Sequence, residues 1–118
     1  MKASFAVGLT LAAMVAASSA WAAGPPDGNY NCFVWLNGIA NKVGAVSIAG
    51  ATYVAKADKG SYGFDGASKT MTFKGPPPLG YKVGVLETTS NGKTAIRMYK
   101  EAENIGKKWG AILCTPQN

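Results

Sequence analysis

The sequence predicts an all-β fold, a small antiparallel up-and-down meander of about eight strands. Three observations lead to this prediction. Apolar and polar residues alternate with a period of two through most of the chain, turn residues separate the alternating stretches, and two cysteines stand near the two ends of the expected domain. A meander of this kind usually closes into a barrel. A two-layer sandwich of the same strands is the alternative.

The first residues have the features of a secretory signal peptide. Lys2 gives a positive start, residues 5–17 form an apolar run, and Ala20-Trp21-Ala22 supplies a small-x-small cleavage pattern. The run is shorter than the roughly 20 apolar residues that span a bilayer. We therefore expect cleavage near Ala22/Ala23 and export to the periplasm or the medium.

Removing residues 1–22 leaves one domain, residues 23–118, with no expected transmembrane segment. A domain of this size buries only about 60 to 65% of the surface of its unfolded chain, so a covalent cross-link would help to stabilise it. We expect it to be a monomer.

The first half of the domain alternates in the manner of strands. Tyr30 and Cys32 begin an alternation through Leu36, which predicts the first strand. Residues 43–48 alternate again, and Ala49-Gly50 forms a turn before a β-branched return. The four strands expected here are 29–36, 43–48, 52–55 and 61–64, with a further turn at 58–60.

The second half continues the meander. Residues 65–68 form a tight hairpin turn, residues 75–78 are a Gly-Pro-rich loop that cannot join a ladder, and Ser90-Asn91-Gly92 is a hairpin turn. The four strands expected between these turns are 70–73, 81–85, 94–100 and 109–114.

Cys32 and Cys114 are the only cysteines, and no C-x-x-C motif is present. In an oxidising compartment a structural disulfide between them is expected. A disulfide requires Cα atoms within about 7 Å, so the bond would place the first and last strands side by side and close the barrel.

The composition excludes several classes of enzyme. The chain has no histidine, so it cannot form a Ser-His-Asp triad, a Cys-His pair or a His-ligated metal site. Asp27, Asp58 and Asp65 stand beside turn residues, while Glu101 and Glu103 are too few for a cation site. We expect no catalytic residues, no metal and no cofactor.

A basic and aromatic surface is the strongest candidate for function. The rings of Phe33, Trp35, Tyr99 and Trp109 lie on the strand parity opposite to that of the cysteines, on strands that adjoin in a closed barrel. With the cations Arg97, Lys107 and Lys108 they form the candidate binding surface. Such a surface suits an anionic polymer such as lipopolysaccharide, teichoic acid or extracellular nucleic acid. The alternatives are that the lysines only keep the sheet soluble, or that these rings fill the barrel.

Three motifs resemble those of small secreted bacterial β-barrel domains that have no defined activity. They are Gly28-Asn29-Tyr30-Asn31-Cys32, Gly60-Ser61-Tyr62-Gly63-Phe64, and Phe73-Lys74-Gly75-Pro76 ahead of Leu79-Gly80. A weaker resemblance is to the periplasmic lysozyme inhibitors, which also pair a Tyr-x-Cys near the start with a Cys near the end. The chain lacks the Ser-Gly-x-x-Tyr loop of that family, and its formal net charge of +6 does not suit a basic partner.

The sequence therefore predicts a secreted or periplasmic binding module that is not an enzyme and acts through its surface on an envelope component or a macromolecule. The alternatives are a carrier of a small apolar ligand, an inhibitor of an envelope hydrolase and a structural envelope protein.

Overall fold

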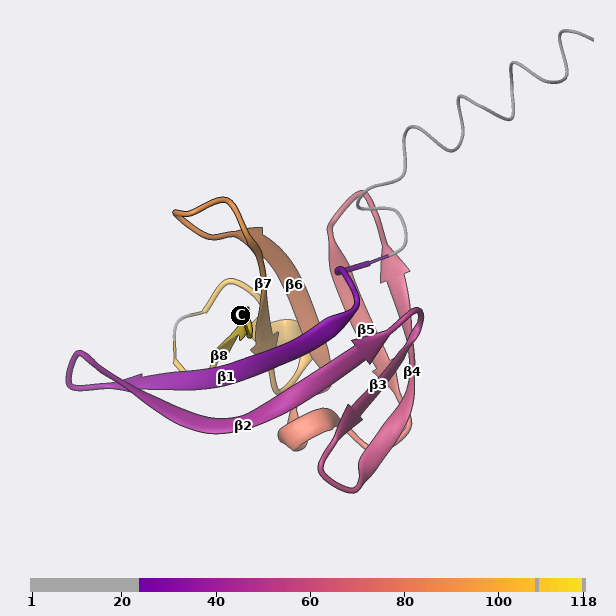
Figure 1. Ribbon diagram of the computed structural model, residues 1–118, viewed down its shortest axis with the longest axis horizontal. Helices are drawn as coiled ribbons and strands as arrows, with labels where there is room; N and C mark the ends of the chain where they lie inside the picture. Colours follow the sequence, from indigo (N-terminus) through magenta and orange to yellow (C-terminus); the bar gives the residue numbers. More distant parts are fainter. Residues whose placement is uncertain (1–23, 108, 118) are drawn as a thin grey trace, which may run out of the picture.

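The computed structural model describes residues 24–107 and 109–117, so the expected signal peptide, 1–22, lies outside the described residues. Eight antiparallel strands form a closed barrel, in which each strand pairs with the next and β8 pairs with β1; their arrangement can be followed in Figure 1. The prediction of a closed barrel is confirmed. The strands are β1 (Gly28–Leu36), β2 (Ile39–Ala49), β3 (Thr52–Ala55), β4 (Asp58–Asp65), β5 (Thr70–Lys74), β6 (Val83–Thr88), β7 (Thr94–Tyr99) and β8 (Ile112–Pro116).

The expected disulfide joins β1 and β8. Cys32 and Cys114 are bonded over a sequence separation of 82 and are directly opposite each other in the ladder. Both are completely buried, and Ile96 of β7 lies beside Cys114 in the next ladder. The bond therefore belongs to the core as well as to the seam that closes the barrel.

The barrel interior is filled by side chains from all eight strands. Phe73 makes edge-on contacts with Tyr53 and Tyr62, with ring centroids 5.1 and 6.4 Å apart. Cys32 and Cys114 belong to this core, which confirms that the face of the first and last strands that carries the cysteines points inward. The core consists of Tyr30, Cys32, Val46, Ile48, Tyr53, Ala55, Tyr62, Met71, Phe73, Leu86, Ile96, Met98, Ile112 and Cys114.

The Gly-Pro-rich loop, which includes the 3-10 helix η1 (Pro78–Gly80), covers part of this core. Pro78 is buried and Leu79 packs against the core. The Tyr53 hydroxyl donates to the Pro76 carbonyl at 2.7 Å, which ties the loop to β3. A second 3-10 helix, η2 (Ala102–Asn104), lies in the connection from β7 to β8.

β1 and β2 extend beyond the barrel as a two-stranded ribbon. β1 pairs with β8 only as far as Phe33, and β2 pairs with β3 only over residues 47–49. We call residues 34–43 the arm. Its two strands pair with each other, and neither has a strand partner along its outer edge. The arm is the long hairpin at the left of Figure 1. The prediction that the second strand begins at residue 43 was wrong, because β2 begins at Ile39.

Other boundaries differ from the sequence-based prediction for local reasons. The turn before β4 is Lys56-Ala57, with Lys56 at φ +58°, so residues 58–60 are strand rather than turn. At the C-terminal end, Gly110 at φ +79° departs from extended backbone. β8 accordingly begins at Ile112, and Trp109 lies in a loop rather than in the last strand.

Stability is expected to fall steeply in alkaline solution because of buried tyrosines. Tyr30 donates to the Pro26 carbonyl at 2.6 Å, and desolvation, followed by the charges of Tyr62 and Asp27, raises its pKa to about 12. Above pH about 10 the Tyr30 hydroxyl loses its proton in the unfolded chain but keeps it in the folded protein. The free energy of unfolding is therefore unaffected by this group below pH about 10 and falls as the pH rises through 12. The loss for one such proton approaches about 1.4 kcal/mol per pH unit.

Urea midpoints measured between about pH 8 and pH 11 test this expectation. The Tyr30→Phe variant serves as the comparison, because it removes the proton while keeping the ring. Its midpoint should fall less with pH than that of the wild type. If the urea midpoint falls equally with pH in both proteins, groups other than the Tyr30 hydroxyl cause the loss of stability.

Candidate binding groove

A groove opens where β1 and β8 separate. The two strands pair as far as Phe33 and Leu113, after which β1 continues into the arm and the chain before Ile112 turns away. The groove between them has a volume of about 810 Å³. It is lined by Val34, Trp35 and Leu36 of the arm, by Arg97 and Tyr99 of β7, by Gly106, Lys107, Trp109, Gly110 and Ala111 of the loop before β8, and by Leu113 of β8.

Most of the candidate surface predicted from the sequence lines this groove. Phe33 is outside the lining but contacts it, since its ring centroid lies 6.4 Å from that of Trp35. Lys108 lies outside the described residues. The predicted residues that line the groove are Trp35, Arg97, Tyr99, Lys107 and Trp109.

The aromatic residues of the groove do not fill the barrel. Phe33, Leu113 and Arg97 form a row across β1, β8 and β7, one position along from the inward row that contains the disulfide. Trp35 is 51% exposed and Trp109 is 91% exposed. Tyr99 is buried although it shares the outward parity of Arg97. The alternative in which these rings form the barrel core is therefore wrong.

The cations of the groove have different surroundings. Arg97 donates to Glu87 of β6 in a bidentate pair, Nε to Oε1 at 2.8 Å and Nη2 to Oε2 at 3.0 Å. This hydrogen bonding raises the pKa of Arg97, and the ion pair balances its charge. Lys107 is exposed, and none of the described lining residues is acidic. The described part of the groove is therefore apolar and aromatic, with the exposed ammonium group of Lys107 in its lining.

Sequence reasoning missed the arm that forms one wall of the groove. Its turn is Asn37-Gly38, with φ of +53° and +80°, the signs that a type I′ hairpin turn requires. An Asn-Gly pair between apolar stretches is a strong hairpin signal. That signal could have placed Val34 and Leu36 beside the predicted aromatic residues.

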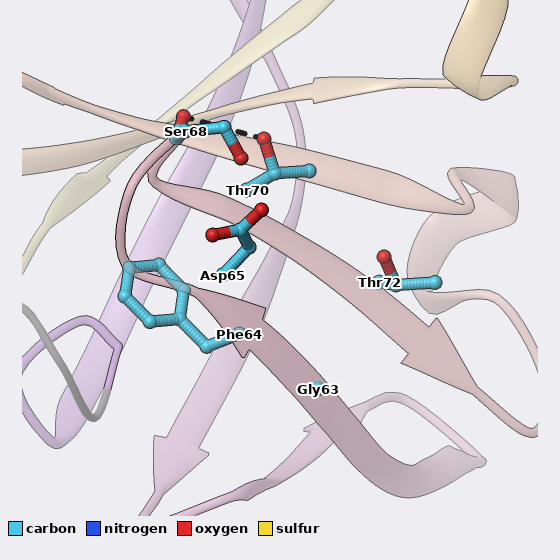
Figure 2. A pocket seen from close by; sticks show the side chains of 6 residues that line it. All are labelled: Gly63, Phe64, Asp65, Ser68, Thr70 and Thr72. Atoms are coloured by element: carbon cyan, nitrogen blue, oxygen red, sulfur yellow. Dashed lines mark hydrogen bonds between the residues drawn. The ribbon is translucent and has the colours of Figure 1, made fainter.

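A second hollow, of about 310 Å³, lies on the β4–β5 hairpin (Figure 2). Its polar groups serve the turn. Asp65 Oδ1 accepts from the Ala67 amide at 3.0 Å, and Thr70 Oγ1 donates to the Ser68 carbonyl at 3.3 Å. Within residues 24–107 and 109–117, no cluster of His, Cys, Asp or Glu could hold a metal ion. This hollow is the weaker candidate for a binding site.

No protein-family model matches the chain, and no curated protein or solved structure is significantly similar to it. The resemblance to small secreted β-barrel domains therefore stays a prediction. In the part of the chain that the structure describes, none of the helices is long and apolar enough to cross a membrane.

Proposed function

We propose that the protein is a secreted or periplasmic binding module, without enzymatic activity, that holds an anionic component of the cell envelope in the groove. One observation carries this proposal. The groove brings Trp35, Tyr99 and Trp109 together with the exposed ammonium group of Lys107, although these residues come from three separate segments of the chain.

The chemistry of the groove supports binding rather than catalysis. Among the described residues its lining has no carboxylate, the sequence has no histidine, and both cysteines are in the disulfide. Carboxylates, imidazoles and thiols are the side chains that most often supply general acid–base or nucleophilic chemistry. The filled barrel interior favours this surface over an internal cavity as the place where a ligand binds.

The disulfide and the N-terminal sequence support an exported location. Disulfides persist in the periplasm and outside the cell and are rare in the cytosol. The apolar run of residues 5–17, followed by Ala20-Trp21-Ala22, supplies the features of a cleaved leader. The mass of the exported protein should lack residues 1–22 and the two hydrogens lost in the Cys32–Cys114 bond.

Retention on isolated bacterial envelopes tests the function. We expect the exported, processed protein to sediment with envelopes. A Trp35→Ala/Trp109→Ala variant should bind about tenfold more weakly or worse, because aromatic residues that become buried at an interface dominate binding energies. The matched control is Val54→Ala, which removes an apolar side chain that is 45% exposed on β3, outside the groove lining. Equal retention of both variants would contradict the assignment of the groove.

Salt dependence tests the charge of the partner. Binding should weaken as ionic strength rises, because salt screens exposed charges. Lys107→Ala should weaken binding at low salt, whereas Lys59→Ala on β4, also exposed, should have little effect. Retention that does not change with salt would contradict an anionic partner.

A further inference from the structure

The tip of the arm exposes apolar side chains on both faces of the ribbon. Trp35 is 51% exposed, Leu36 57% and Ile39 64%. Leu36 and Ile39 are directly opposite each other, so they share one face, and Trp35 points to the other face because successive strand residues alternate. The tip therefore lacks the polar outer face that a ribbon exposed only to water would have.

The charged residues of the arm and of the described groove lining are all basic. Lys42, opposite Phe33 at the base of the arm, is the only charged residue in 34–43. Lys107 lines the groove beside the arm, and Trp109 in the same groove is 91% exposed. The partner that binds this surface should therefore have both an apolar region and a negative charge.

Two other occupants fit these observations less well. A rigid protein surface would cover one face of the ribbon and leave the other in water. A second copy of the chain in a symmetric contact would place Lys42 and Lys107 of the two chains close together, and like charges repel. A lipid interface can surround both faces of a thin ribbon, and tryptophan rings favour that environment.

We propose that the arm inserts its tip into the interface of an anionic phospholipid leaflet, with Lys42 and Lys107 at the headgroups. This inference rests on the proposed function and names the partner of the same surface. Insertion would be shallow, because Asn37 is polar and the outer backbone edges of the arm have no strand partner. Such groups need water or headgroups for hydrogen bonding, which places the tip at the headgroup–acyl boundary.

Vesicle co-sedimentation tests this proposal with the exported protein. The probes are vesicles of phosphatidylglycerol mixed with phosphatidylcholine, and vesicles of phosphatidylcholine alone. We expect binding to the anionic vesicles, and a loss of about tenfold or more in Leu36→Asp, because a charge would enter the acyl boundary. Val54→Asp on β3 is the matched control and should bind like the wild type. Any contribution from residues N-terminal to the barrel is the same in both variants.

A Lys42→Ala/Lys107→Ala variant isolates the electrostatic part. Each lysine near an anionic surface contributes to binding, so the double variant should bind anionic vesicles about tenfold more weakly at low salt. Equal binding to the two kinds of vesicle would overturn the requirement for anionic lipid. Wild-type binding by Leu36→Asp would overturn insertion of the tip.

The envelope assay separates this inference from the proposed function. If the wild type sediments with envelopes but not with anionic vesicles, and envelope binding still depends on Trp35 and Trp109, the partner is not the lipid and the binding function stands. If the wild type binds neither envelopes nor vesicles, both proposals are overturned.

Discussion

Replacing Cys32 and Cys114 together with alanine is expected to lower the free energy of unfolding by about 2 to 5 kcal/mol. The bond joins the first and last strands over a sequence separation of 82, so it restricts the unfolded chain strongly. Small domains have only about 5 to 15 kcal/mol of stability in total. Urea unfolding, followed by far-ultraviolet circular dichroism, measures the change.

The reduced wild-type protein separates the cross-link from the packing of the sulfur atoms. Both cysteines are completely buried, so the alanine variant also loses core contacts, whereas reduction breaks only the bond. We expect reduced wild type to lose most of the stability that the double variant loses. An unchanged urea midpoint on reduction would contradict a stabilising role for barrel closure.

Gly60→Ala is expected to destabilise the protein by about 2 to 4 kcal/mol, because a methyl group has no space there. A Cβ at residue 60 would lie 2.4 Å from the Lys74 carbonyl oxygen and 2.8 Å from the Tyr53 hydroxyl. That hydroxyl donates to the Pro76 carbonyl. The substitution therefore forces backbone to move and disturbs the bond that ties the Gly-Pro-rich loop to β3.

Gly63→Ala is the matched control in the same strand. A Cβ at residue 63 would meet only the end of the Lys74 side chain, at 3.5 Å or more, which is an ordinary contact. Its effect on unfolding should stay within about 1 kcal/mol in either direction. Similar thermal and urea midpoints for the two variants would show that the close packing around Gly60 does not limit stability.

The barrel could be predicted because its determinants are local or covalent. Alternation around Tyr30 and Cys32 identifies a strand and divides it into two faces, and the Cys32–Cys114 bond defines which strands meet at the seam. The aromatic residues of the groove were identified by the same parity argument. Phe33 and Trp35 follow Cys32 on the opposite face of β1, which period-two alternation alone specifies.

The groove itself could not be predicted, because it depends on where pairing stops. Residues 37–42 do not alternate clearly, so only the Asn37-Gly38 turn indicates that β2 begins at Ile39. The opposite wall depends on Gly110, whose left-handed backbone precedes β8 and leaves Trp109 in a loop. Neither feature changes the count of strands, and each is set by backbone conformation that apolar periodicity does not encode.

The position of the disulfide has a mechanical consequence for the arm. A pull on the arm that peels β1 away from β8 reaches Phe33 and Leu113 first, and the next pair along the ladder is Cys32 and Cys114. Separation of β1 from β8 therefore stops at a covalent bond after one residue pair. Without the bond, such a force would break the hydrogen bonds between β1 and β8 one after another. With the bond, the force is transmitted to the core, where the sulfur atoms are packed.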